Sequence, residues 1–246
     1  MFRRAKRGLS AAIAATVLSL TESFVAAAPA AAYDIYGGDL IYIKRHNGTL
    51  GQCTLNSVAR RGGALYGITS GHCMPGAAKV LASDRKTPIA SNLADSGYIN
   101  VGSGLNERND DIGWFRLDPH VKDAHAMRGG SLTAGVLGVD TKLVELWRSF
   151  FPVRGVAGRA PVTAVRPGTI VCKDGGRTGR TCGPVLSVRA GSGEIIAVLP
   201  SATGDSGAPV YMTGPGGKAI IVGVLTGAGW GQTMIDAVQP LPAGLH

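Results

Sequence analysis

The chain has 246 residues, a formal net charge of +9, 37 glycines and four cysteines. Its basic residues are scattered and are not interleaved with aromatic side chains, which argues against a nucleic-acid platform. The charge is interpreted as a contribution to solubility or as attraction to anionic surfaces, and it says little about a substrate.

Residues 1–32 predict a secretory signal peptide. A basic cluster at residues 3–7 precedes the apolar run Leu9–Leu20, and a small-residue stretch ends at Ala30–Ala32. A membrane anchor is disfavoured because residues 21–23 (TES) interrupt the run before the roughly 20 residues needed to span a bilayer. Cleavage near Ala32 removes four basic residues and one acidic residue, which lowers the net charge from +9 to +6. We therefore expect an extracellular protein without a stable membrane anchor.

The remaining chain predicts an all-β fold. Its apolar runs are short, and turn-forming residues bound each of them, as is typical of sandwiches and barrels. No long 3.6-residue period or fixed repeat is visible. The expected strands include the runs Leu40–Ile43, Ala64–Ile68, Ile112–Leu117, Glu194–Leu199 and Ile220–Leu225.

One segment, Asp140–Pro152 (DTKLVELWRSFFP), predicts a short helix instead. Its apolar residues recur at i, i+3, i+4 and i+7, with Asp140 as a possible N-cap and Pro152 as terminator. Two interpretations stay open: a helix packed on the body of the protein, or a flap that faces a substrate.

The four cysteines predict two disulfides in an exported protein. Three pairings are possible, and the spacings favour two local loops, Cys53 with Cys73 and Cys172 with Cys182. A zinc site is the competing interpretation, and it is disfavoured because the chain has no CxxC motif and no closely spaced pair of histidines.

The segment Gly204–Pro209 (GDSGAP) carries the strongest chemical signal. A serine between glycines sits on a tight turn that exposes its hydroxyl, and the N–H groups of Gly204 and Ser206 can stabilise an oxyanion. An ordinary hairpin turn is the alternative interpretation of the tetrapeptide GDSG.

A serine nucleophile needs a base, and His72 is the best candidate. It follows a predicted strand in the sequence TSGHC, where a bridge from Cys73 to Cys53 can hold its loop. The other histidines lie in polar, turn-like surroundings or at the end of the chain: His46, His120, His125 and His246.

The third residue of a triad is a buried carboxylate that fixes the imidazole tautomer. Two adjacent acids, Asp110 and Asp111, open the apolar run DDIGWF. Asp111 directly precedes the apolar residues and is the candidate for burial, whereas Asp110 is expected to face solvent.

TSGHC, DDIGWF and GDSGAP, in this order, resemble the chymotrypsin superfamily of serine proteases. The segments Gly37–Asp39, Cys172–Gly183 and Gly223–Gly227 extend the resemblance to its bacterial branch, that of α-lytic protease and the streptogrisins. The resemblance covers about Gly37 to Val238. It implies two six-stranded antiparallel β-barrels with the active site between them, and the bridges Cys53–Cys73 and Cys172–Cys182.

This resemblance sets the expected domains. Residues 33–125 form the N-terminal barrel, 126–160 an inter-barrel connection with the helix-like insert, and 161–246 the C-terminal barrel. The chain departs from the family in lacking a long pro-region before Gly37 and the third bridge near the nucleophile, and in its longer segment between Asp111 and Cys172. Pro240 and Pro242 argue against the C-terminal helix that is common in the family.

The resemblance also implies supporting roles. Lys173, where bacterial relatives have arginine, is expected to pair with Asp205 and hold the nucleophile loop. The primary substrate pocket is expected to be uncharged, and Asp236 is the one acid that could approach it from the far side. The expected lining residues are Pro200, Ser201, Ala202, Thr226, Gly227 and Ala228.

The predicted function is a secreted serine endopeptidase with the triad His72, Asp111 and Ser206. It acts on peptide or protein substrates after small or medium apolar residues, without a metal or an organic cofactor. The oligomeric state is not predicted. A non-catalytic, protease-like binding protein and an esterase that uses the same chemistry are the alternatives, although an esterase normally carries a GxSxG elbow in an α/β fold.

Overall fold

A computed structural model describes residues 31–102, 110–129, 152–229, 231–238 and 241–246. The predicted signal peptide lies outside these residues up to position 30, and so does the predicted helix up to position 151. Within the described residues the regular elements are strands and short 3₁₀ turns, so the predicted all-β fold class is confirmed. These residues belong to one compact unit, Ala31–His246.

The first body of the fold, here called the N-terminal barrel, consists of two four-stranded antiparallel sheets that share a hydrophobic core. In the order in which neighbouring strands pair, one sheet is β3-β2-β6-β7 and the other is β4-β5-β9-β8. The strands are β2 (Leu40–Arg45), β3 (Leu50–Thr54), β4 (Ser57–Arg61), β5 (Ala64–Thr69), β6 (Ala77–Leu81), β7 (Pro88–Ala90), β8 (Gly97–Val101) and β9 (Asp110–Arg116).

Strand β2 shows why an uninterrupted apolar run forms a strand here. Ile41 and Ile43 point into the main core of the barrel, whereas Leu40 and Tyr42 pack with Leu81 in a second, smaller cluster. Successive side chains of a strand face opposite sides, so burial on both faces requires apolar residues at every position.

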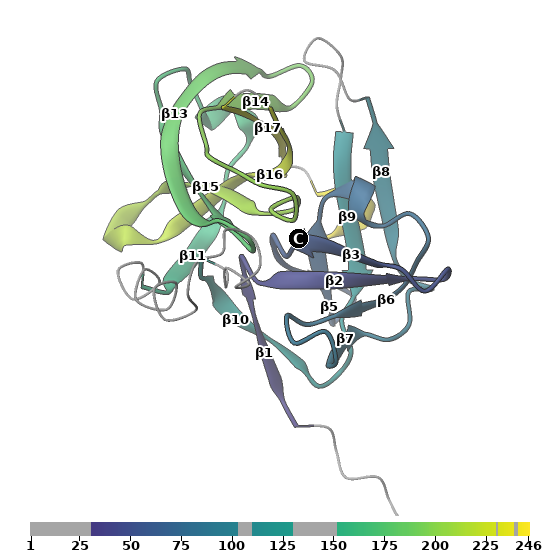
Figure 1. The fold of residues 1–246 in the computed structure, drawn as a ribbon. Coiled ribbons are helices and arrows are strands. Elements are labelled where there is room, and N and C mark those ends of the chain that lie inside the picture. The colour runs from purple at the N-terminus through teal and green to yellow at the C-terminus, as the bar shows by residue number, and fades with distance from the viewer. Residues whose placement is uncertain (1–30, 103–109, 130–151, 230, 239–240) are drawn as a thin grey trace, which may run out of the picture. The chain divides into compact units, whose positions relative to one another are not determined.

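The second body, the C-terminal barrel, is a closed six-stranded antiparallel barrel. Its strands pair in the order β16-β15-β12-β13-β14-β17, and β17 pairs with β16 to close the ring. Figure 1 shows these strands, green to yellow, gathered beside the purple-to-teal strands of the N-terminal barrel. They are β12 (Ile170–Gly175), β13 (Gly179–Arg189), β14 (Glu194–Ala197), β15 (Pro209–Thr213), β16 (Ala219–Gly229) and β17 (Gln232–Ala237).

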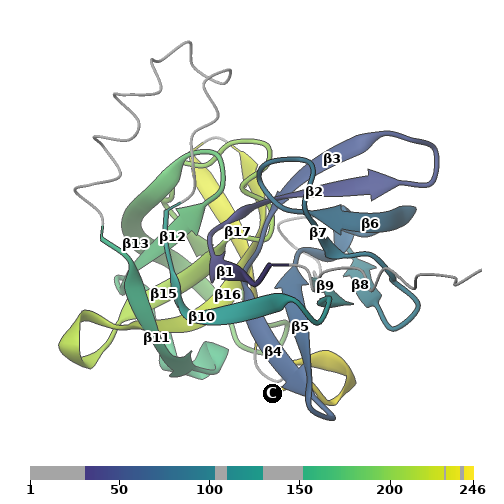
Figure 2. The same cartoon turned by 90° about the horizontal axis from the view of Figure 1, so that it is seen from below.

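Three further strands connect the barrels. The strand β10 (Val121–Met127) lies between β1 (Tyr33–Gly37) and β11 (Arg154–Arg159). The strand β11 in turn pairs in parallel with β16 of the C-terminal barrel (Figure 2). The predicted inter-barrel connection, residues 126–160, therefore contains β structure at both of its ends.

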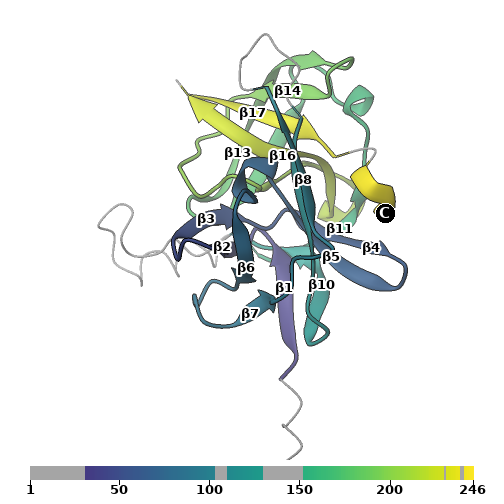
Figure 3. The same cartoon turned by 90° about the vertical axis from the view of Figure 1, so that its right-hand side faces the viewer.

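Buried polar side chains hold the two bodies together. The Ser70 hydroxyl donates to the carbonyl of Leu225 at 2.8 Å, and the Asn56 amide donates to the carbonyls of Ala208 and Gly223 at 3.3 and 3.1 Å. Each bond joins the N-terminal barrel to the C-terminal barrel. In Figure 3 the strands β14 and β17 lie above β2, β6 and β7, and β8 crosses the region between them. Because buried polar groups are costly without partners, these bonds define the relative position of the two barrels.

The described chain ends in a 3₁₀ turn, η4 (Pro242–Gly244). Leu241 and Leu245, on either side of this turn, are buried, and the backbone of Arg60 exchanges two hydrogen bonds with His246. Within the described residues there is no helix of the length and apolarity that a membrane span requires.

Candidate active site

His72 and Asp111 are in direct contact. The histidine lies on the short 3₁₀ turn η1 (Gly71–Cys73) and the aspartate at the start of β9. Asp111 Oδ2 lies 2.7 Å from His72 Nδ1, and Asp111 Oδ1 accepts the backbone N–H of His72 at 2.7 Å. A carboxylate only accepts hydrogen bonds, so this contact places a proton on Nδ1 and leaves Nε2 free to act as a base.

The side chains of His72 and Asp111 differ in exposure, as a base and the carboxylate that orients it are expected to do. The Asp111 side chain is 7% exposed, whereas the imidazole of His72 is 38% exposed. The aspartate is thus shielded from competing water, while the free face of the ring stays accessible. Of the two adjacent acids, Asp111 is the buried one, and Asp110 is intermediate in exposure.

A glycine and a disulfide shape the turn that carries His72. A Cβ at Gly71 would lie 1.9 Å from the carbonyl oxygen of Ile99, so no larger residue fits there. The bridge Cys53–Cys73 joins the turn to the end of β3, and its two sulfurs lie within 4.8 Å of a ring nitrogen of His72. Both cysteines are spent in the bridge, so this cluster of possible ligand atoms offers no thiolate to a metal.

The loop that carries Ser206, the candidate nucleophile, approaches the same segment from the C-terminal barrel. Thr54 donates its backbone N–H to the carbonyl of Ser206 at 2.7 Å. A Cβ at Gly207, whose φ is +94°, would lie 2.1 Å from the carbonyl oxygen of Thr54, so the close approach needs a glycine. Ser206 is thereby held beside the residue that follows Cys53 in the chain. The sequence motifs did not indicate that Thr54 contacts Ser206, although its position directly after Cys53 of a predicted bridge was a usable signal.

The two candidate oxyanion donors are available. Within the described part of the chain, neither the N–H of Gly204 nor that of Ser206 donates a hydrogen bond. The carbonyl of Gly204 is held by the hydroxyl of Thr54 at 2.8 Å, and that hydroxyl also accepts the N–H of Gly176 at 2.9 Å. No hydrogen bond joins Ser206 Oγ to His72 among the described residues, and such bonds are often long until a substrate is bound.

The side chain of Arg177 packs against Gly204. The sequence interpretation assigned no role to this arginine. A Cβ at Gly204, whose φ is +98°, would lie 2.6 Å from Arg177 Cγ. The guanidinium of Arg177 donates to the side chain of Gln52 on β3. The conformation of the loop that carries Ser206 therefore requires glycine at 204 for two reasons, the positive φ and the Arg177 side chain packed against it.

Asp205 and Lys173 form the predicted contact inside the C-terminal barrel. Lys173 Nζ lies 3.4 Å from Asp205 Oδ2, and both side chains are completely buried. Burial lowers the pKa of Lys173, and the adjacent Asp205 opposes that shift. The lysine also donates to Thr178 Oγ1 at 2.5 Å and to the carbonyl of Gly179 at 3.2 Å.

Most of the hydrogen bonds to Asp205 come from other groups than the lysine. Oδ1 accepts the N–H groups of Arg177 and Thr178 at 2.8 and 3.1 Å. Oδ2 accepts the Thr178 hydroxyl at 2.6 Å and the N–H of Ala202 at 3.0 Å. The β12–β13 hairpin, closed by the bridge Cys172–Cys182, thus supplies three of these hydrogen bonds, and the loop before Ser206 supplies the fourth.

The residues expected to line the substrate pocket come from two segments that meet at β17. The Ser201 hydroxyl donates to the carbonyl of Leu199 and lies 3.3 Å from Thr233 Oγ1 on β17. Thr226 donates to the carbonyl of Met234 on the same strand, and β17 is paired along Gly227–Gly229 of β16. The assignment of Pro200, Ser201, Ala202, Thr226, Gly227 and Ala228 to the pocket stays a prediction.

Asp236 does not lie where the sequence interpretation placed it. It was considered as an acid that could approach the pocket from the far side. Instead its Oδ2 accepts the backbone N–H of Asp111 at 2.7 Å, across the boundary between the barrels. The strand alternation could not reveal this, because it does not say which element covers that face.

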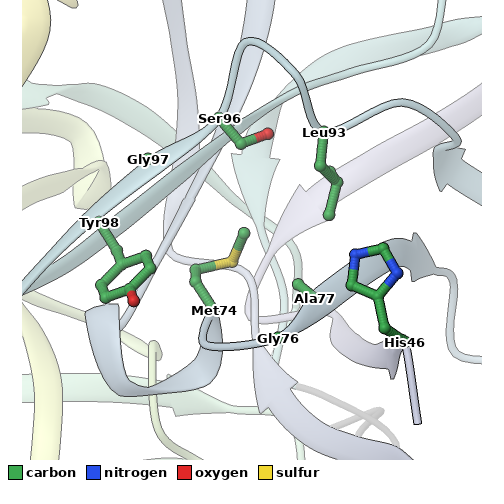
Figure 4. A pocket seen from close by; sticks show the side chains of 8 residues that line it. All are labelled: His46, Met74, Gly76, Ala77, Leu93, Ser96, Gly97 and Tyr98. Atoms are coloured by element: carbon green, nitrogen blue, oxygen red, sulfur yellow. The ribbon is translucent and has the colours of Figure 1, made fainter. Parts of the chain in front are cut away.

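Two cavities lie near these elements. One, of about 310 Å³, adjoins η1 and is lined by apolar groups of Met74, Leu93 and Tyr98 together with His46 and Ser96 (Figure 4). Met74 directly follows Cys73, so this cavity borders the segment that carries His72. The other, of about 230 Å³, lies among β4, β10 and β11, and its lining includes Arg159.

Comparisons with known proteins agree with this architecture. No family model matches the chain. Two uncharacterised proteins from strains of Mycobacterium tuberculosis are 43% identical over 79 residues, which is 30% of this chain and 35% of theirs. The match thus spans about a third of the length of these curated relatives.

Solved structures cover most of the chain. Thermobifida fusca protease A has a TM-score of 0.53 at 22% identity and covers 87% of this chain and 97% of its own. Nocardiopsis protease has a TM-score of 0.54 at 18% identity, covering 84% and 94%. Cellulomonas bogoriensis chymotrypsin has a TM-score of 0.55 at 20% identity, covering 87% and 98%. The chain therefore has the two-barrel fold of the bacterial chymotrypsin-like serine proteases, as predicted.

Proposed function

We propose that this protein is a secreted serine endopeptidase with the triad His72, Asp111 and Ser206. The observation that carries the proposal is the 2.7 Å contact between His72 Nδ1 and Asp111 Oδ2 at the boundary of the two barrels. The fold of bacterial serine proteases and the glycine-flanked Ser206 beside Thr54 support it.

In the proposed reaction Ser206 Oγ attacks the carbonyl carbon of a peptide bond while His72 Nε2 takes the hydroxyl proton. The N–H groups of Gly204 and Ser206 stabilise the negative charge on the carbonyl oxygen. His72 then gives its proton to the departing amine as the C–N bond breaks, which leaves an acyl-enzyme. Water, with His72 again as base, hydrolyses the ester and restores Ser206. These steps need neither a metal nor an organic cofactor.

Lys173 and Asp205 would keep the nucleophile loop in its active form. Their contact is internal to the C-terminal barrel, so it requires no N-terminal amine released by cleavage. The hydrogen bonds from Arg177, Thr178 and Ala202 to the same carboxylate add to this support.

The proposed substrates are peptides or proteins that are cleaved after small or medium apolar residues. Pro200, at the expected base of the pocket, carries no charge that could offset the desolvation of a charged side chain. The two disulfides fit the oxidising environment outside the cytosol.

The test is covalent labelling of the purified protein with a fluorophosphonate, which reacts with an activated serine. We expect labelling of the wild type that is lost in Ser206→Ala. In a second assay, the unlabelled wild type should cleave members of a peptide library. A folded wild type that neither reacts with the probe nor cleaves any library peptide would reject the enzyme in favour of a non-catalytic, protease-like binding protein. Turnover of esters without peptides would favour the esterase.

A further inference from the structure

Asp236 is a buried carboxylate on β17 that the proposed triad does not include. Its exposed fraction is 6%, and it lies in register with Glu194 on β14 and Val224 on β16. Buried carboxylates are costly unless a cation or hydrogen bonds compensate them, so each one calls for an explanation.

The carboxylate reaches across the boundary between the barrels. Asp236 Oδ2 accepts the backbone N–H of Asp111 at 2.7 Å, although the two residues are 125 positions apart in the chain. The side chain of the same Asp111 binds both the backbone N–H and the Nδ1 of His72. Short hydrogen bonds on the backbone and the side chain of Asp111 thus link β17, through the start of β9, to the imidazole.

We propose that Asp236 is a positioning residue for the triad, which holds the backbone of Asp111 and so sets the orientation of His72. This inference rests on the proposed function, because orientation of His72 matters only if it acts as a base. Sub-ångström placement of a general base is worth orders of magnitude in rate, so loss of this hydrogen bond should be visible in turnover.

The charged groups around Asp236 in the described part of the chain are mainly acids. From β9 it faces Asp110 and Asp111, and from β14 it faces Glu194, whose Oε2 lies 2.8 Å from Arg189 Nη1. On the remaining sides lie Val224 of β16 and the turn at Gly193. In the described part of the chain no lysine, arginine or histidine lies within 4.0 Å of its carboxylate.

This environment gives Asp236 two charge states near neutral pH. Burial raises its pKa to about 7; Asp110 and Asp111 add to the shift, and the hydrogen bonds from the N–H groups of Asp111 and Ala237 oppose it. Either form can accept the N–H of Asp111, but only the ionised form adds a negative charge behind the His72–Asp111 pair. That charge favours the imidazolium, which forms while Ser206 is attacking.

Two substitutions at Asp236 separate these contributions. Asp236→Asn keeps a carbonyl acceptor for the Asp111 N–H and removes the charge, whereas Asp236→Ala removes both. We expect Asp236→Ala to lower kcat by about 100-fold with little change in KM, as misplacement of a catalytic group does. Asp236→Asn should keep most of kcat below pH 6, and the acid limb of its kcat/KM profile should move to lower pH. Asp123→Asn removes a partly buried carboxylate on β10, outside the site and away from Asp236, and it serves as the control that leaves the profile in place.

A readout that needs no turnover keeps the inference separate from the proposed function. The proton on His72 Nδ1 gives a low-field ¹H NMR resonance when it is held against Asp111, and Asp236→Ala should broaden or shift it more than Asp236→Asn. A wild type that fails to react with a fluorophosphonate would reject the proposed function alone. An active wild type whose kcat, pH profile and resonance are unchanged in Asp236→Ala would overturn the positioning role. Equal losses in both variants at every pH would also overturn it and reduce Asp236 to a packing residue.

Discussion

Asp205 and Asp236 are both buried carboxylates of the C-terminal barrel, and their surroundings satisfy them in opposite ways. Asp205 lies beside Lys173 and accepts four further hydrogen bonds from its own barrel. Asp236 has acids as its charged neighbours, and one of its hydrogen bonds comes from the other barrel. A carboxylate beside a cation can act as a fixed support, whereas burial without an adjacent cation raises the pKa of a carboxyl group, to about 7 for Asp236.

The two regions also connect to different members of the proposed triad. The Asp205 region holds the loop of Ser206, the proposed nucleophile, and the Asp236 region holds the backbone of Asp111, which contacts the proposed base, His72. If both regions serve one reaction, substitutions in either should lower the rate of acylation. Only substitutions near Asp236 should also change the pH dependence of that rate.

The largest expected effect tests whether the two regions serve one reaction at all. Ser206→Ala and His72→Ala should each lower kcat by about 10⁴-fold or more, and the double variant should be hardly worse than either single variant, because the triad acts as a unit. Steady-state kinetics with a cleaved library peptide measures this. Additive losses would mean that the two residues do not act together, and circular dichroism checks that each variant is folded.

The next effect concerns the two adjacent acids on β9. Asp111→Asn should cost about 10⁴-fold in kcat, since the amide presents a donor to Nδ1 and favours the wrong tautomer. Asp110→Asn should cost little, because the His72 contacts go to Asp111. The same kinetic assay compares them, and a larger loss in Asp110→Asn would transfer the orienting role to that residue.

Removal of the cation beside Asp205 should destabilise the protein. Breaking a buried pair by deleting one partner costs about 3–5 kcal/mol. We expect Lys173→Met to lower the free energy of unfolding by such an amount in a urea titration, and to lower kcat because the nucleophile loop loses its support. Lys218→Met, at an exposed lysine, is the matched control. Wild-type kcat and stability in Lys173→Met would show that the hydrogen bonds from the hairpin suffice.

Substitution of Asp236, unlike that of Lys173, is expected to increase the free energy of unfolding near neutral pH. The pKa of Asp236 is raised from 3.8 to about 7 in the folded protein, so the native state holds this proton more tightly than the unfolded chain. The preferential binding of this proton stabilises the folded state fully below about pH 4, and the stabilisation is lost as the pH rises to about 7. Asp236→Asn cannot ionise, so its stability relative to the wild type should rise over this range by up to about 4 kcal/mol. Urea titrations from pH 4 to 8 measure the difference, and a flat difference would contradict the comparison with Asp205.

The smallest effect concerns substrate preference. Selectivity among apolar side chains should be shallow, because each methylene contributes only about 1 kcal/mol or somewhat more. Ala228→Gly should widen the entrance of the pocket and improve cleavage after aromatic residues relative to Ala or Val. A library profile measures both. A profile dominated by Arg and Lys, or by Glu, would reject the uncharged pocket and leave the contrast between Asp205 and Asp236 untouched.

Much of the architecture could be predicted from the residues alone because it depends on local patterns. The short apolar runs between turn formers indicate strands, and a resemblance in three motifs indicates the two-barrel fold and the bridges Cys53–Cys73 and Cys172–Cys182, both of which the structure contains. The contact of His72 with Asp111, rather than Asp110, followed from the apolar run that comes directly after Asp111.

Other features depend on contacts between residues that are far apart in the chain. Thr54 binds Gly204 over a separation of 150 residues, and Asp236 binds Asp111 over 125. The alternation of side chains along β17 identifies which residues share a face, but the element that covers the face follows from how two barrels dock. For this reason the sequence left open an approach of Asp236 to the pocket from the far side, and only the docked barrels place its carboxylate behind the His72–Asp111 pair.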